Sequence, residues 1–174
     1  GEESEHDHGG PGEHHHGEGG PHRTLAEVLT IVDSLDIPAT VRAEAGSIFE
    51  GLAAAEAAVH GTDPAETQFH EVGADDAIAD VVGVCLLLAN LDPDRVVTTP
   101  LSTGGGTVEM SHGVYPVPAP AVVELAERAD WSLRGGPVEA ELLTPTGAAI
   151  LAHAADGVGS LPSLDVATSG YGAG

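Results

Sequence analysis

The feature that most constrains the fold is an apolar stripe with helical spacing between Val41 and Val59. Its members lie alternately four and three residues apart, which places them on one face of a long helix: Val41, Ala45, Ile48, Leu52, Ala55 and Val59. Pro38 suits the first turn of this helix and Gly61 suits its C-cap, so we predict a helix over about 39–60. Only 3% of the residues are aromatic, so Ala, Val and Leu have to build the core around it.

The remainder of the chain after residue 22 alternates helical and strand-like segments. Thr24 and Glu27 form a capping-box pattern that begins a helix ending near Leu35. Further helices are predicted over about 75–90, 119–129 and 145–155, and strands near 67–72, 95–99, 106–108, 131–134 and 163–168. We therefore expect an α/β fold, a layered domain of alternating helices and short strands over residues 23–174, whose strand order the sequence does not reveal.

Residues 1–22 contain no apolar side chain. They comprise seven Gly, six His, six Asp or Glu, two Pro and one Ser, so this segment has nothing to bury and is predicted to be disordered. Imidazole together with carboxylate suits late first-row divalent metals, with nickel high in the affinity order. We therefore interpret residues 1–22 as a His-, Gly- and Glu-rich metal-binding linker, with His14, His15 and His16 as its principal ligands.

The charge balance excludes several classes of partner. The formal net charge is −23, with five arginines and no lysine, so the chain lacks the basic surface that nucleic acid or an anionic membrane would require. The acids extend through residues 23–174, which favours a protein from a halophilic organism. No apolar run is long enough to span a bilayer, no signal peptide is recognisable, and the single Cys85 sits in an apolar run, so we expect a cytoplasmic protein without an internal disulfide.

A first group of candidate site residues lies where a predicted strand gives way to a helix. His70 and Glu71 end the strand, and Asp76 and Asp80 are four apart, hence on one helical face. Carboxylates turned inward from an otherwise apolar helix would need a metal ion or a proton-transfer task to offset their desolvation. We predict these four residues as metal ligands or acid–base groups, whereas Asp75 suits a first-turn residue that the helix dipole stabilises.

Two loops are candidates for binding anionic groups. The first follows a strand and consists of Ser102, Thr103, Gly104, Gly105, Gly106 and Thr107, whose backbone N–H groups can approach an anion closely. It has neither the lysine of a P-loop nor the dinucleotide G-x-G-x-x-G spacing. The second is a stiff helix start, with Thr144 as N-cap and Pro145 at the first position, whose free amides around Thr146 and Gly147 suit phosphate. His112, soon after the glycine loop, is a further candidate metal ligand.

Five ordered blocks of the sequence resemble the LarC family of nickel insertion proteins. They are the His-rich linker, FHEVGADDAIADVVG (69–83), LSTGGGTVEMSHGVYPVPAPA (101–121), ELLTPTGAA (141–149) and SGYGAG (169–174). The resemblance implies insertion of Ni(II), as the substrate metal, into a pyridinium-3,5-bisthiocarboxylic acid mononucleotide, the precursor of the nickel-pincer nucleotide of lactate racemase-type enzymes. It also implies that the full-length protein is a nickel chelatase (cyclometallase) of the lyase class, uses CTP with Mn(II) or Mg(II), and has the racemase-type apoenzyme as a partner.

The family usually has an additional strand before this region and a ferredoxin-like domain after it, so we expect the chain to be the later part of an N-terminal domain. The resemblance matches Asp76 and Asp80 but not Asp75. In this interpretation His70 or Glu71 is the general base, which removes the proton from the ring carbon that becomes bonded to nickel. The loops at 102–107 and 144–147 hold the pincer nucleotide.

Two other functions stay open from the sequence: a nickel storage or delivery protein without chemistry of its own, and a carboxylate-based, metal-dependent phosphohydrolase. The activity of this part alone and its assembly into a homo-oligomer stay open as well.

Overall fold

The computed structural model describes residues 23–69, 73–110 and 113–171. In these ranges the elements follow in the order β1 (Arg23–Thr24), α1 (Leu25–Ser34), α2 (Ala39–His60), β2 (Gln68–Phe69), α3 (Asp75–Leu91), β3 (Val97–Thr98), β4 (Leu101–Ser102), β5 (Thr107–Met110), β6 (Gly113–Pro116), α4 (Pro120–Arg128), β7 (Leu133–Arg134), α5 (Pro145–Ala154) and β8 (Gly157–Val158). The predicted alternation of helices and short strands is confirmed. The predicted disorder of residues 1–22 concerns a segment outside the described ranges.

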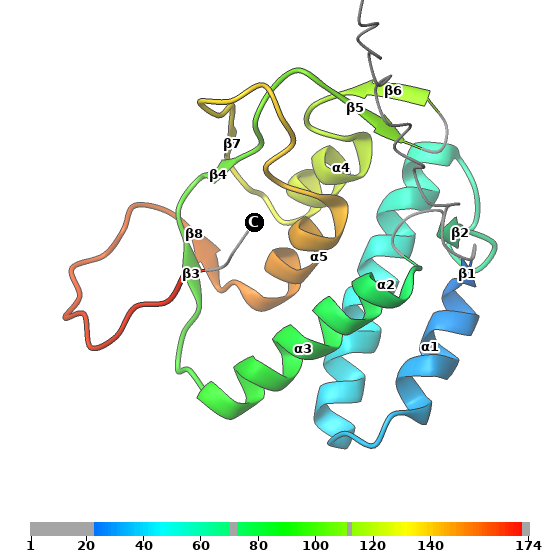
Figure 1. Cartoon of the computed structure of the whole chain (residues 1–174), viewed down its shortest axis with the longest axis horizontal. Coiled ribbons are helices and arrows are strands. Elements are labelled where there is room, and N and C mark those ends of the chain that lie inside the picture. The colour runs from blue at the N-terminus through cyan, green and yellow to red at the C-terminus, as the bar shows by residue number, and fades with distance from the viewer. Residues whose placement is uncertain (1–22, 70–72, 111–112, 172–174) are drawn as a thin grey trace, which may run out of the picture.

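Helix α2 is the centre of the packing. Helices α1, α3, α4 and α5 all contact it (Figure 1). Its buried residues are Val41, Ala45, Ile48, Phe49, Leu52, Ala53, Ala55 and Ala57. Half of these are alanines, which let neighbouring backbones come close, whereas the larger side chains fill the space between helices. The apolar stripe that the sequence displays is thus the surface on which the other helices assemble, except at its end, where Val59 is 39% exposed.

The predicted helix ends are mostly confirmed, with one correction. Thr24 and Glu27 form both hydrogen bonds of a capping box at α1, and Gly61 ends α2 with a left-handed φ of 67°. Pro38, predicted within the first turn of α2, is instead its N-cap. Its ψ of 141° is extended, so helical dihedral angles begin only at Ala39.

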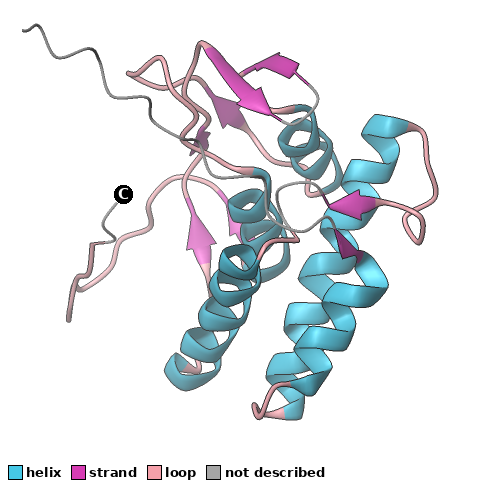
Figure 2. Cartoon of the chain, turned by 45° about the vertical axis from the view of Figure 1, so that its right-hand side comes forward, coloured by secondary structure: helices cyan, strands magenta, loops and turns pink. Residues whose placement is uncertain are grey.

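The strands form four separate two-stranded pairs among the described residues. β1–β2 and β5–β6 are antiparallel, and β3–β8 and β4–β7 are parallel. Figure 2 shows these pairs along the edges of the helical body. Three of the four pairs join segments far apart in the chain, so each connects one part of the helix bundle to another. The β4–β7 pair places Ser102 beside Arg134.

One predicted strand does not form. Residues 163–168 are irregular and exposed, with Leu164 and Val166 at 53% and 72% of their full exposure. Their alternating pattern suits a strand, but no described segment pairs with them. Helix α3, predicted to be largely buried, buries only one face, because Leu87 and Leu91 remain exposed. No helix in the described part of the chain is both long and apolar enough to cross a bilayer.

The two phenylalanines of the chain contact each other at the centre of the core. Phe49 on α2 and Phe69 on β2 are both fully buried, with ring centroids 6.2 Å apart and ring planes tilted by 57°. This arrangement is a favourable one for aromatic pairs. It also anchors the end of β2, directly before the candidate residues His70 and Glu71, to the central helix.

The substitution Phe49→Ala should lower the free energy of unfolding by about 3–5 kcal/mol, since it leaves a cavity between α2 and β2. Exposed Glu50, the next residue on α2, supplies the control: Glu50→Ala should change the value by less than about 0.5 kcal/mol. Urea denaturation followed by circular dichroism measures both. Equal small effects would show that the Phe49–Phe69 contact does not stabilise the fold.

Candidate functional site

The start of α3 is tied to β1 by one arginine. The Arg23 Nη1 donates to the Gly73 carbonyl at 2.7 Å and to the Asp75 carboxylate at 2.6 Å. Gly73 is buried where the chain passes close to β1 and β2, and a Cβ there would lie 2.9 Å from the Cβ of Phe69. Glycine is therefore required at this position for steric reasons. Asp75 is a structural partner of Arg23, in agreement with the prediction that it is a first-turn residue.

Asp76 and Asp80 lie on one face of α3 as predicted, but the predicted inward orientation is wrong. Both residues are exposed, because α3 turns its apolar positions 77, 78, 81, 82 and 85 toward the core. The Asp76 Oδ1 accepts a hydrogen bond from the Ala77 N–H at 2.9 Å. These carboxylates therefore pay no desolvation cost that a metal ion would have to offset. Both are accessible to a cation from solvent.

Several predicted ligands lie outside the described residues: His70, Glu71, His112, His14, His15 and His16. Residues on both sides of His70 and Glu71 are fixed. Phe69 is paired with Arg23 in β1–β2, and Gly73 accepts a hydrogen bond from that same arginine. Within the described ranges, no three His, Cys, Asp or Glu side chains are grouped closely enough to hold a metal ion. A complete metal centre there would need ligands from outside these ranges.

The glycine loop is held against residues 134–142 by backbone hydrogen bonds. The Thr103 N–H donates to the Arg134 carbonyl at 2.9 Å, and the Gly105 N–H donates to the Ala140 carbonyl at 3.3 Å. The Leu142 N–H donates in turn to the Thr103 carbonyl at 3.0 Å. Two of the amides that were predicted to be available for an anion are thus already used. The Thr103 side chain is only 3% exposed, which makes a direct ligand role for it unfavourable in this arrangement.

The glycines of this loop permit close backbone approach. Gly104 has a φ of +86°, and a Cβ on it would lie 1.7 Å from the Ala140 carbonyl oxygen. On the other side of the loop, the Glu139 carboxylate lies next to Gly105 and Gly106, about 3.5 and 3.3 Å from the positions their Cβ atoms would take. This carboxylate would repel an anion at Gly105 or Gly106 and would attract a cation.

The second predicted anion loop is a well-formed helix start. Thr144 is the N-cap of α5, its Oγ1 accepts from the Gly147 N–H at 3.2 Å, and Pro145 has no N–H. The Ala148 N–H bonds to the Thr144 carbonyl. Among the described residues, this leaves the Thr146 N–H as the one donor of the first turn without a partner. The predicted capping is confirmed, and the supply of amides is smaller than expected.

The glycine loop lies next to the start of α5, and helix α5 contacts α3. Leu142, which bonds to Thr103, lies two residues before Thr144, so the glycine loop and the α5 start are directly connected. Helices α3 and α5 contact each other and run side by side, with both N-termini toward the right of Figure 1. Asp76 and Thr144 therefore belong to neighbouring helix starts.

Sequence reasoning missed Arg134. Its Nε donates to the Ser102 Oγ at 3.0 Å, and its carbonyl accepts hydrogen bonds from the N–H and Oγ1 of Thr103. The arginine is exposed, so it adds positive charge at the first residue of the predicted anion loop. Its proximity arises from the parallel pairing of β4 with β7, which connects positions 32 residues apart, so no local motif displays it.

Two other reactive side chains are structural. Cys85 is buried, and burial, followed by the charge of Glu44, raises the pKa of its thiol, which keeps it protonated and unsuited to binding metal. His153 on α5 pairs with Glu44 on α2, so it connects two helices. Both side chains therefore serve the fold.

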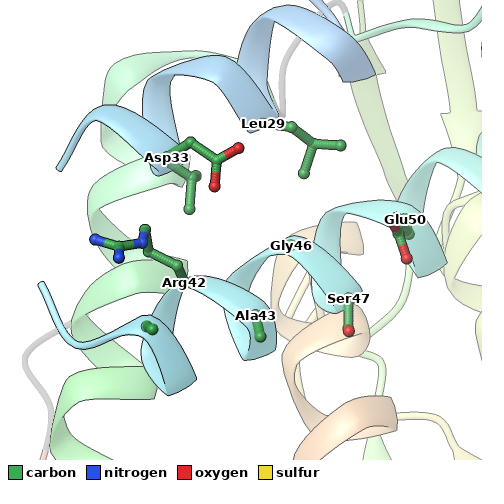
Figure 3. A pocket seen from close by; sticks show the side chains of 9 residues that line it. Leu29, Asp33, Arg42, Ala43, Gly46, Ser47 and Glu50 are labelled. Carbon is green, nitrogen blue, oxygen red and sulfur yellow. The ribbon is translucent and has the colours of Figure 1, made fainter.

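Two hollows in the described surface lie away from the candidate residues. The larger, about 350 Å³, lies between α1 and α2. Figure 3 shows the side chains of Leu29 and Asp33 lining it from α1, and those of Arg42 and Glu50 from α2. The Arg42 guanidinium is already engaged, since its Nη1 donates to two carbonyls of the α1–α2 turn. A second hollow of about 220 Å³ lies among α2, α4 and α5. None of the predicted site residues lines either hollow.

Comparisons with known proteins point to one family. A family model described as "Nickel insertion protein" matches residues 5–174. A protein of Methanosarcina barkeri described as a nickel insertion protein is 49% identical over 153 residues, 87% of this chain and 39% of the relative. The pyridinium-3,5-bisthiocarboxylic acid mononucleotide nickel insertion proteins of a Nocardioides species and of Staphylococcus saprophyticus are 46% and 38% identical, each over 88% of this chain and 38% and 39% of the relative.

The chain thus spans about two fifths of the length of the curated relatives it matches. No solved structure matches it.

The glycine loop offers a matched pair of substitutions. Gly104→Ala should lower the free energy of unfolding by at least about 2 kcal/mol, because its φ is left-handed and its Cβ would collide with the Ala140 carbonyl. Gly105→Ala should cost less than about 1 kcal/mol, because its Cβ would meet only the flexible Glu139 carboxylate. Chemical denaturation of the two variants tests this order. The reverse order would refute the pairing of the loop with residues 134–142.

Proposed function

Since the chain belongs to the nickel insertion protein family, we propose that it takes part in inserting Ni(II) into a pyridinium-3,5-bisthiocarboxylic acid mononucleotide. The observation that carries this proposal is the family match over residues 5–174, together with two relatives whose names specify that nucleotide. The product of the reaction would be the nickel-pincer nucleotide used by lactate racemase-type enzymes, and the protein would act in the cytoplasm of a salt-adapted cell.

The described geometry supports a metal-handling role for the α3 start. Asp76 and Asp80 are exposed on one face, and the chain on both sides of His70 and Glu71 is fixed by Arg23. We assign His70, Glu71, Asp76, Asp80 and His112 to the nickel site of the core. Either His70 or Glu71 would accept the proton released when the ring carbon bonds to nickel, because imidazole and carboxylate can both serve as general bases near neutral pH.

Nucleotide binding would use the loops at 102–107 and 144–147. Much of their backbone is engaged in the fold, so the available donors are few, and the Thr146 N–H is one of them. The strong negative charge of the chain opposes the binding of a further anion. Charge compensation would therefore depend on a bound cation or an arginine.

The remaining features of the reaction concern the whole protein. We infer a CTP-dependent nickel chelatase of the lyase class that uses Mn(II) or Mg(II) with CTP and delivers its product to a racemase-type apoenzyme. The linker of residues 1–22 would collect Ni(II) through its histidines, with His14, His15 and His16 adjacent in sequence.

Three neighbouring aspartates test the nickel site. Asp76→Asn and Asp80→Asn should each reduce the rate of nickel incorporation into the nucleotide at least about tenfold, since each removes a charged oxygen ligand. Asp75→Asn is the matched control, because it removes the same charge from an aspartate that pairs with Arg23 and lies outside the proposed site. The rate is followed by the absorbance of the product. The same loss in all three variants, or in none, would remove Asp76 and Asp80 from the site.

Removing residues 1–22 tests the role of the linker. The number of Ni(II) ions bound per chain should fall, while incorporation at saturating Ni(II) should stay unchanged, because the linker raises only the local nickel concentration. Equilibrium dialysis counts the bound metal. If the truncated chain instead binds neither nickel nor the nucleotide, a storage or delivery protein without chemistry of its own is the better description.

A further inference from the structure

We propose that Arg134 holds the phosphate group of the mononucleotide, at a position set by Ser102. This inference rests on the proposed function and specifies where the most strongly charged group of the nucleotide would bind. It depends on the use of the five arginines, on the contacts that orient Arg134, and on the distribution of charge around the glycine loop.

Arginines are scarce in this chain, and most serve the fold. Arg23 pairs with Asp75, Arg42 donates to the carbonyls of Leu35 and Ile37, and Arg128 pairs with Glu124. Within the described ranges Arg42, Arg95 and Arg134 form no ion pair with any of the many carboxylates, and of these three Arg42 is already engaged by two backbone carbonyls. A guanidinium that is not neutralised in so acidic a chain retains its full attraction for an external anion.

Arg134 differs from Arg95 in being oriented. Its Nε donates to the Ser102 Oγ at 3.0 Å, and its backbone is fixed by β4–β7 pairing and by two hydrogen bonds from Thr103. No described residue accepts from its Nη1 or Nη2. A guanidinium held at Nε presents its remaining donors as a planar fork, which matches two oxygens of a phosphate.

The charge around the loop determines on which side an anion can bind. The Glu139 carboxylate lies beside Gly105 and Gly106, so the second half of the loop repels anions. Ser102 and Arg134 lie at the first half, where a hydroxyl and a guanidinium act together. The glycine loop is thereby divided into an anion-attracting start and a cation-attracting end.

The phosphate is the group of the nucleotide that this start suits best. It carries close to two negative charges at neutral pH, whereas each thiocarboxylate carries one. The soft sulfur atoms of the thiocarboxylates are also better suited to bind nickel than to accept hydrogen bonds from an arginine. The repulsion between the acidic chain and the nucleotide is therefore largest at the phosphate, where compensation by a guanidinium has the largest effect.

The test measures binding of a stable probe by isothermal titration calorimetry. The probe is pyridinium-3,5-dicarboxylic acid mononucleotide, the oxygen analogue of the substrate, and its companion is the corresponding nucleoside without phosphate. Arg134→Gln should weaken binding of the mononucleotide about tenfold and leave the nucleoside unaffected, since one charge-assisted contact to phosphate is lost. Arg134→Lys should give an intermediate loss, because it keeps the charge but not the fork.

Arg95→Gln is the matched control, since it removes the same charge from an exposed arginine without an ion pair. Its affinity for the mononucleotide should equal that of the wild type. If Arg95→Gln and Arg134→Gln weaken binding of the mononucleotide equally, the effect comes from the net charge of the chain and the proposal is overturned. Equal weakening of mononucleotide and nucleoside by Arg134→Gln would also overturn it, because the contact would not be to phosphate.

Failure of the inference and of the proposed function can be separated. If the wild-type chain binds the mononucleotide and Arg134→Gln binds it with the same affinity, only the role of Arg134 is refuted. A wild-type chain that binds neither probe would contradict the nucleotide-binding role itself, and the assignment of Arg134 with it.

Discussion

The packing of α2 against four other helices is the constraint on which the rest of the structure depends. Every other helix contacts it, and half of its buried side chains are alanines, which permits close approach on several sides at once. Helices α3 and α5, whose N-termini carry candidate site residues, are positioned by this common contact. Larger side chains at the alanine positions would separate the helices and move those two helix starts relative to each other.

The candidate site is limited more by its supply of positive charge than by its supply of backbone donors. The amides of Thr103 and Gly105 and most of the first turn of α5 are engaged within the fold, so they give rigidity to the loops. The proposed binding of an anionic nucleotide to so acidic a chain would then require cations at defined points. Exposed carboxylates at Asp76 and Asp80 and at Glu139 are suited to recruit divalent metal, and Arg134 supplies fixed charge where metal is not required.

Much of the helical structure can be predicted from sequence because its determinants are local. The stripe from Val41 to Val59, the capping box at Thr24 and the Thr144–Pro145 start all predict what the structure has. The limits of the strands are less predictable, because all the described strands except β5 and β6 pair with a distant segment of the chain. Residues 163–168 have a suitable pattern, but no described segment pairs with them, and they are irregular.

The same distinction explains the errors at the site. Helical spacing correctly places Asp76 and Asp80 on one face, but it does not reveal that this face points to solvent. That orientation follows from which side of α3 meets α2, a tertiary property. Arg134 was missed for a related reason, because its neighbour Ser102 is brought to it only by the pairing of two short strands.

The double hydrogen bond of Arg23 also sets a maximum distance for metal transfer. Arg23 contacts Gly73, which closes the segment containing His70 and Glu71, and His16 precedes Arg23 by only seven residues. Seven residues span at most about 25 Å when fully extended. Whatever path the intervening residues take, an ion held at His16 stays within roughly that radius of Arg23. In the proposed function, handover from the linker to the start of α3 would thus be a short intramolecular step.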